Sequence, residues 1–139
     1  MPTLLFSCGK IDYQMNYMGE QVMVKVKEVN LERGFPTVAV AMSRLTNELT
    51  TAKMSGYKAM VIIHGFGSSG EGGRIKAATG KKIKEPMFRG IIKDAVRGEE
   101  WASKKKGFIG HCSQLKEFER HISGNEGVTV LLLKWRKSD

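Results

Sequence analysis

An apolar run and the glycine-rich segment after it decide the fold: Met60-Val61-Ile62-Ile63, then His64-Gly65-Phe66-Gly67-Ser68-Ser69-Gly70-Glu71-Gly72-Gly73-Arg74. The apolar run has strand character, and the following residues 75–83 can form a helix. Five glycines between a strand and a helix let the backbone pass close to a ligand. Because amide groups at a helix start favour anions, this segment predicts a phosphate-binding loop.

The chain before this loop predicts one further strand and one further helix. Residues 22–31 alternate between apolar and polar side chains, which is typical of a half-buried strand. From Val38 to Ala52, apolar residues recur at steps of three and four, with Pro36 at the first turn and Gly56 beyond the end. This pattern predicts an amphipathic helix.

The first twenty or so residues fit either a hairpin or a tail.

The chain after the loop is less regular. Residues 91–96 fit either a short strand or a continuation of the preceding helix, and we expect a strand. Residues 97–110 are polar and contain Lys104-Lys105-Lys106, so they are interpreted as an exposed basic insertion. The run at 127–133 is too apolar for an edge strand and predicts a central one. The expected core order is therefore βαβαββ.

Composition narrows the function classes. A chain of 139 residues with 41% hydrophobic and 27% charged residues is expected to form one globular domain. Its net charge of +9 predicts attraction to polyanions. Two cysteines are too few for a disulfide framework or a zinc cluster, and no secretion signal or membrane segment stands out. We therefore expect a cytoplasmic protein without a membrane partner.

The glycine loop has rival interpretations. Residues 65–70 match the Gly-x-Gly-x-x-Gly fingerprint of dinucleotide sites, with Glu85 as a candidate ribose ligand. That fingerprint normally follows the first strand of a sheet with several more parallel strands, whereas only some sixty residues remain here. A Walker loop is excluded because no Gly-Lys-Ser/Thr closes the segment. A tight turn without a ligand is the remaining alternative.

A combination of motifs resembles the small MutS-related (Smr) domain family. The loop and the arginine after it are similar to that family's His-Gly-x-Gly-x-Gly and Leu-Arg motifs, in its long form. The resemblance covers roughly residues 22–134 and rests on Val61-Ile62-Ile63-His64-Gly65-x-Gly67, Gly72-Gly73-Arg74-Ile75, Val29-Asn30-Leu31-Glu32-Arg33-Gly34, Thr37-Val38 and Gly127-Val128-Thr129-Val130.

The resemblance implies a fold and a class of partner. The implied fold is a compact two-layer α/β sandwich over residues 22–139, similar to the C-terminal domain of bacterial initiation factor three, with residues 1–21 as an N-terminal extension. The implied partner is structured DNA or RNA, and some Smr domains nick DNA or cleave RNA. This chain departs from the first family motif, with Asn30 in place of Asp, Glu32 in place of His and one inserted residue before Thr37. An asparagine cannot act as a carboxylate base.

The candidate site residues lie at the ends of two strands and in the loop. Parallel neighbouring strands would bring Glu32, Arg33 and His64 to the same edge as the loop. His64 is the candidate proton carrier, and Glu32 or Glu71 is the candidate for positioning a water or a divalent ion, Mg²⁺ or Mn²⁺, if the site is catalytic. A packing role for His64 is the alternative. The candidate phosphate-binding residues are Arg33, Gly65, Gly67, Gly70, Gly72, Gly73, Arg74 and Lys76.

Three hypotheses about function follow from the sequence. The first is a structure-selective nuclease, and the second is a nucleic-acid-binding or adaptor module without chemistry. The third is protein association through a sheet edge or the N-terminal extension. In the first two, further basic residues would supply salt-sensitive affinity with little base preference; these are Lys81, Lys82, Lys84, the 104–106 run, Lys134, Arg136 and Lys137.

Overall fold

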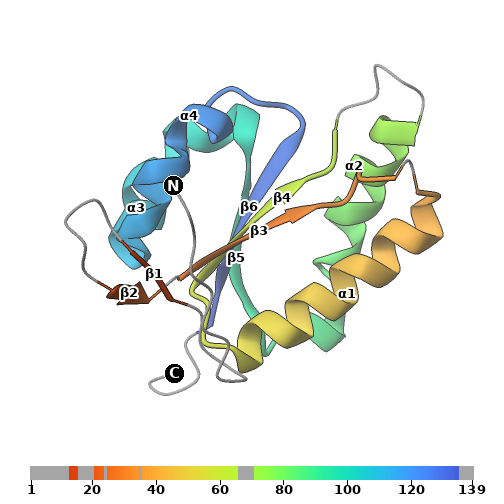
Figure 1. Ribbon diagram of the computed structural model, residues 1–139. Helices are drawn as coiled ribbons and strands as arrows, with labels where there is room; N and C mark the ends of the chain where they lie inside the picture. Colours follow the sequence, from red (N-terminus) through yellow and green to blue (C-terminus); the bar gives the residue numbers. More distant parts are fainter. Residues whose placement is uncertain (1–12, 16–20, 24, 35, 66–70, 135–139) are drawn as a thin grey trace.

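The computed structural model describes residues 13–15, 21–23, 25–34, 36–65 and 71–134. Figure 1 shows the path of the chain. The strands are β1 (Tyr13–Met15), β2 (Gln21–Met23), β3 (Val26–Asn30), β4 (Ala59–Ile63), β5 (Ile92–Arg97) and β6 (Val128–Leu133). The α-helices are α1 (Val38–Met54), α2 (Glu71–Lys82), α3 (Trp101–His111) and α4 (Glu119–Ile122), and the 3-10 helices are η1 (Pro86–Phe88), η2 (Gly98–Glu100) and η3 (Ser113–Phe118).

The main sheet has four strands in the order β3-β4-β6-β5. β3 pairs with β4 in parallel, while β6 is antiparallel to both β4 and β5. The carboxyl ends of β3, β4 and β5 therefore lie along one edge of the sheet, which we call the rim. Every residue of β6 is buried between two neighbours, which confirms the prediction of a central strand at 127–133.

Helices cover both faces of this sheet, which makes three layers. Figure 1 shows α1 and α2 on one face and α3 and α4 on the other. One apolar core contains Leu45, Leu49 and Phe88, and a second contains Trp101, Phe108 and Ile122. The α/β sandwich is confirmed, but the expectation of two layers is corrected because residues 97–122 form a second helical layer.

That second layer also corrects the interpretation of residues 97–110 as an exposed insertion. Trp101 and Phe108 are fully buried, and their rings pack edge to face with centroids 5.9 Å apart. The Trp101 indole Nε1 donates a hydrogen bond to Glu119 Oε2 at 3.3 Å. Lys104-Lys105-Lys106 do lie on the exposed side of α3. The segment is thus an amphipathic helix whose polar side dominates its composition.

Local sequence signals explain α1 and β5. The Thr37 hydroxyl caps α1 by accepting a hydrogen bond from the Val40 amide at 3.3 Å, and four apolar side chains of the predicted stripe are buried against the sheet: Ala41, Leu45, Leu49 and Ala52. The choice of a strand for residues 91–96 is confirmed by β5. The predicted strand at 22–31 is instead two strands, because β2 pairs with β1 as a hairpin and β3 joins the main sheet.

None of the helices in the part of the chain that the structure describes is both long and apolar enough to cross a membrane. Cys112 is buried and not in a disulfide, and burial raises the pKa of its thiol. Cys8, Arg136 and Lys137 lie outside the described residues.

Candidate nucleic-acid interface

The ends of the parallel strands bring distant segments together at the rim. Asn30 stands opposite Ile63 in the β3–β4 register, and the Leu31 amide donates to the Ile63 carbonyl at 2.8 Å. The predicted adjacency of the two strand ends is confirmed. Glu32 and Arg33 therefore follow β3 at the same edge where His64 and Gly65 follow β4.

Glu32 lies directly against the backbone of Gly65. Gly65 has a φ of 74°, and a Cβ added there would meet Glu32 Oε2 at 1.9 Å. The Glu32 amide donates to Asn30 Oδ1 at 2.8 Å, so the Asn30 side chain shapes the turn that carries Glu32. Glycine at position 65 thus satisfies both a left-handed backbone and the close approach of a carboxylate.

His64 is completely buried, with both ring nitrogens hydrogen-bonded. Nδ1 lies 2.7 Å from the Gly65 carbonyl oxygen, and Nε2 lies 2.8 Å from the Thr129 hydroxyl. Because a carbonyl can only accept, the neutral ring donates from Nδ1 and accepts the Thr129 proton at Nε2. Burial lowers the pKa of His64, an effect that the Gly65 bond opposes and the nearby Lys76 charge reinforces. This environment holds the ring neutral as a packed part of the rim.

The lowered pKa of His64 predicts a pH-dependent stability. Above about pH 6.5 the ring is neutral in both the folded and the unfolded chain. Below that pH the unfolded chain binds a proton that the folded chain excludes, so the free energy of unfolding falls with decreasing pH until the folded pKa is reached. The expected slope from this group approaches about 1.4 kcal/mol per pH unit. Urea unfolding between pH 7.5 and 5.0 measures it.

The matched comparison uses a second histidine. His64→Gln is expected to lower stability at pH 7.5 and to flatten its pH dependence, and His121→Gln, at an exposed position of α4, is the matched control for replacing a histidine at the surface. Parallel pH profiles for the parent chain and His64→Gln would contradict the assignment of this proton to His64.

A basic groove runs along the exposed side of α2. It has a volume of about 430 Å³ and is lined by Gly73, Lys76, Ala77, Gly80, Lys81, Lys84 and Arg97. Residues 73, 77 and 80 recur at three- and four-residue steps within α2, so they share one helix face, and Lys84 follows just beyond the end of the helix. Nothing lies within 4 Å of a Cβ added at Gly80, which leaves open space above the helix backbone there. We call this feature the α2 groove.

Acidic partners fix one wall of the α2 groove. Glu99 Oε2 lies 3.0 Å from Lys76 Nζ and 3.9 Å from Arg97 Nε, and Arg97 Nη2 lies 2.8 Å from Glu100 Oε2. Burial tends to raise the pKa of Glu99, but the Lys76 hydrogen bond and the two cations together hold it below its ordinary value. Among the described residues, neither Lys81 nor Lys84 forms an ion pair.

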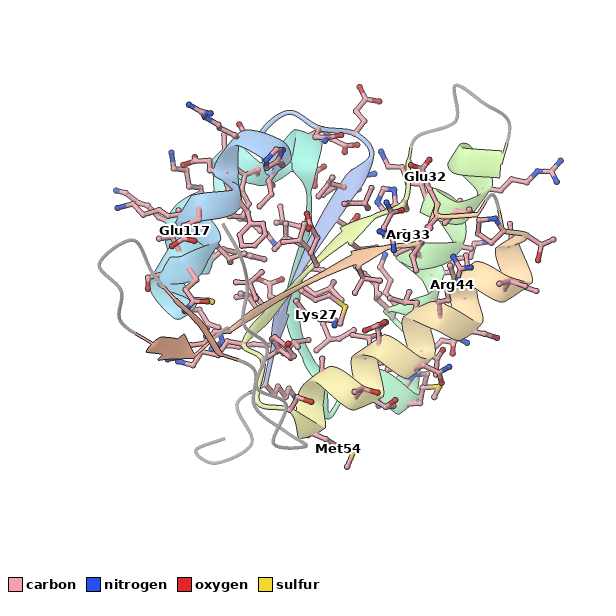
Figure 2. All side chains as sticks on the ribbon, in the orientation of Figure 1. Lys27, Glu32, Arg33, Arg44, Met54 and Glu117 are labelled. Carbon is pink, nitrogen blue, oxygen red and sulfur yellow. The ribbon has the colours of Figure 1, made fainter. Side chains whose placement is uncertain are left out.

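A second groove follows the outer edge of β3. It is lined by Lys27, Glu28, Val29, Asn30, Arg33, Arg44, Glu48 and Ile63. Figure 2 shows Glu32 and Arg33 at the tip of β3, with Arg44 facing them from α1. Arg44 Nη1 donates to the Arg33 carbonyl at 2.8 Å, which anchors that guanidinium group. We call this feature the β3 groove.

The predicted site residues therefore divide among three places. Glu32, His64 and Gly65 meet at the rim, Gly73 and Lys76 line the α2 groove, and Arg33 lines the β3 groove. Gly72 and Arg74 belong to the first turns of α2, and Arg74 is exposed. Gly67 and Gly70 lie outside the described residues.

Sequence reasoning missed Arg44 and Arg97. Arg44 sits on the polar side of a helix that was recognised only by its apolar stripe. Arg97 reaches the rim because β5 runs parallel to β3 and β4, a topology that strand patterns alone do not reveal. No local motif marks either residue.

Among the described residues of the rim, the donor set does not match a protein-held divalent metal. In the part of the chain that the structure describes, no three His, Cys, Asp or Glu side chains converge. Hard cations prefer several carboxylate or carbonyl oxygens, whereas Asn30 Oδ1 already accepts the Glu32 amide. Glu32 is the carboxylate that touches the backbone at the rim.

Comparison with known proteins identifies the family. The Smr domain matches residues 33–134, which is most of the chain. No curated protein and no solved structure matches this sequence. The chain therefore belongs to the Smr domain family, and the resemblance drawn from its motifs is confirmed. This membership supports nucleic acid as the general class of partner.

Proposed function

We propose that this domain binds the sugar-phosphate backbone of nucleic acid along the α2 groove, without using His64 for proton transfer. The observation that carries the proposal is the alternation of small and cationic residues along the α2 groove. Gly73, Ala77 and Gly80 let a bulky backbone approach, while the lysines beside them reach its phosphates. The family assignment supports the same class of ligand.

Charge balance supports Lys81 and Lys84 as the main contacts. Lys76 and Arg97 already share Glu99, so part of their charge is neutralised within the protein. Lys82 lies 3.5 Å from Glu85. Lys81 and Lys84 have no acidic partner among the described residues, so they add uncompensated positive charge to the groove.

The buried ring of His64 favours binding over cleavage. A general acid or base must come within hydrogen-bonding reach of the reacting oxygen. Both nitrogens of His64 are already bonded inside the protein, and the ring has no exposed surface. The nuclease hypothesis therefore lacks its proposed proton carrier in this arrangement. Among the described residues of the rim, Glu32 remains as a candidate for chemistry.

Salt-dependent binding tests the proposal. A 16-base-pair DNA duplex and an RNA hairpin are titrated with the parent chain between 50 and 200 mM salt. Lys81→Gln/Lys84→Gln is expected to make the plot of log K against log salt shallower by about 1.8, because each lost phosphate contact removes about 0.9. Lys106→Gln/Lys116→Gln removes two exposed lysines from the face of the sheet opposite α2. It is the matched control and is expected to bind like the parent, because this proposal, unlike the expectation from sequence, gives the 104–106 run no role in affinity.

Two results would reject this function. The first is that the parent chain binds neither probe, or binds a probe with an affinity that does not weaken with salt. The other is Mg²⁺- or Mn²⁺-dependent cleavage of either probe that is lost in Glu32→Ala and in a folded His64→Gln variant. Such cleavage would restore the nuclease hypothesis. Product that persists in both variants would instead identify a contaminant.

A further inference from the structure

We propose that Arg33 and Arg44 form a second phosphate site, so that the domain contacts both backbones of a double helix across one groove. This inference rests on the proposed binding along α2 and adds to it the form of the ligand. Three features support it: the lack of ion pairs to the two arginines among the described residues, the distance of the arginines from the α2 groove, and the acidic side chain of Glu32 at the rim between them.

The two arginines are placed together and lack acidic partners. The Arg44 guanidinium is anchored by its bond to the Arg33 carbonyl, which leaves its other N–H groups available. Within the described residues, no ion pair involves either arginine. Of the acids in the β3 groove, Glu48 lies 4.0 Å from Lys27 Nζ, and Glu28 lies earlier on the strand. The positive charge is therefore concentrated at the rim end.

The sheet sets the separation between the two sites where they meet the rim. Arg33 follows β3, and Arg97, which lines the α2 groove beside Lys81 and Lys84 and shares Glu99 with Lys76, ends β5; these are the two outer strands of the four-stranded sheet. Three strand spacings of about 4.8 Å place the two edges about 14 Å apart. The major groove of DNA is about 12 Å wide, so the backbones on its two sides match this separation.

At the rim, Glu32 lies at the end of β4, between the two outer strands that lead to the two sites. Its carboxylate lies on Gly65, which follows β4, the strand between β3 and the β6–β5 pair. A single strand passing from one site to the other would carry its phosphates over this negative charge. A double helix places its groove there instead, and its phosphates stay on the two cationic sides. The charge pattern thus favours two backbones over one continuous strand.

A ligand with one charged backbone distinguishes contact with two backbones from contact with one continuous strand. The probes are a 16-base-pair DNA duplex and the same DNA strand paired with peptide nucleic acid, whose backbone is neutral. For the DNA duplex, Arg33→Gln/Arg44→Gln is expected to reduce the slope of log K against log salt by about 1.8. Raising the salt from 50 to 200 mM then weakens the binding of this variant roughly tenfold less than the binding of the parent. For the hybrid, the same variant is expected to bind like the parent. Lys81→Gln/Lys84→Gln is expected to weaken binding to both probes.

The outcomes distinguish this inference from the proposed function. Equal loss on both probes for the arginine variant would show that both sites contact one strand, and no loss on either would show that the arginines are not a phosphate site. Each result overturns the inference while binding along α2 stands. Absence of salt-sensitive binding by the parent chain would overturn the proposed function itself. Parent-like binding to the hybrid shows that the arginine variant is folded, and Arg33→Lys/Arg44→Lys is expected to restore the slope on the duplex.

Discussion

Replacing Trp101 with alanine is expected to lower the free energy of unfolding by about 3–5 kcal/mol. The side chain has no exposed surface, packs edge to face against Phe108 and donates a hydrogen bond to Glu119. Removing it leaves a cavity between α3 and the sheet and removes a partner of the Glu119 carboxylate. Urea unfolding followed by circular dichroism, at a pH above the range in which His64 titrates, measures the change.

The control for Trp101 lies in the same helix. Lys106→Ala changes an exposed position of α3 and is expected to alter stability by no more than about 0.5 kcal/mol. A loss below about 1 kcal/mol for Trp101→Ala would mean that residues 97–110 are exposed, as composition alone suggested, and that the second helical layer is wrong.

Gly98→Ala is the second substitution with a large expected effect. A Cβ at this buried position would lie 2.1 Å from the Asn125 carbonyl oxygen and 2.6 Å from that of Ile122. Both atoms belong to the backbone, so the turn before β6 must move. We expect a loss of about 3 kcal/mol in the free energy of unfolding, at the upper end of overpacking costs.

The displaced turn is also the one that holds the rim. The Gly127 carbonyl accepts hydrogen bonds from the His64 amide at 2.8 Å and the Gly65 amide at 3.1 Å. Gly98→Ala is therefore expected to speed hydrogen exchange at both amides as well as to lower stability. Gly107→Ala is the matched control, because nothing lies within 4 Å of its added Cβ, and it is expected to stabilise α3 by about 0.5–1 kcal/mol. Equal stability of the two variants would contradict the close packing around Gly98.

The sequence predicted the elements that carry strong periodic signals. Three patterns each predict one element: the apolar stripe of α1, the apolar run of β4 before the loop and the apolar run of β6. The lengths of these patterns exclude most other assignments of secondary structure. The parallel pairing of β3 with β4 follows from the helix that connects them. These features also placed Glu32, Arg33 and His64 at one edge correctly.

The remaining features depend on contacts between distant segments. Trp101 and Phe108 are two apolar residues in a strongly polar stretch, so only the sheet face that they cover reveals that they are buried. The burial of His64 depends on Thr129, which is 65 residues away. Arg44 joins Arg33 only because the start of α1 packs beside the tip of β3. Periodicity carries no information about such partners.

The central position of β6 determines when the main sheet can be completed during synthesis. The strand made last among the four, Val128–Leu133, is the one that joins β5 to the β3–β4 pair. A nascent chain that stops before Val128 lacks the bonds that align Arg97 with Glu32 and Arg33. The edge that carries these three residues is thus assembled only when this strand has left the ribosome, so under the proposed function an unfinished chain is expected to bind nucleic acid less well.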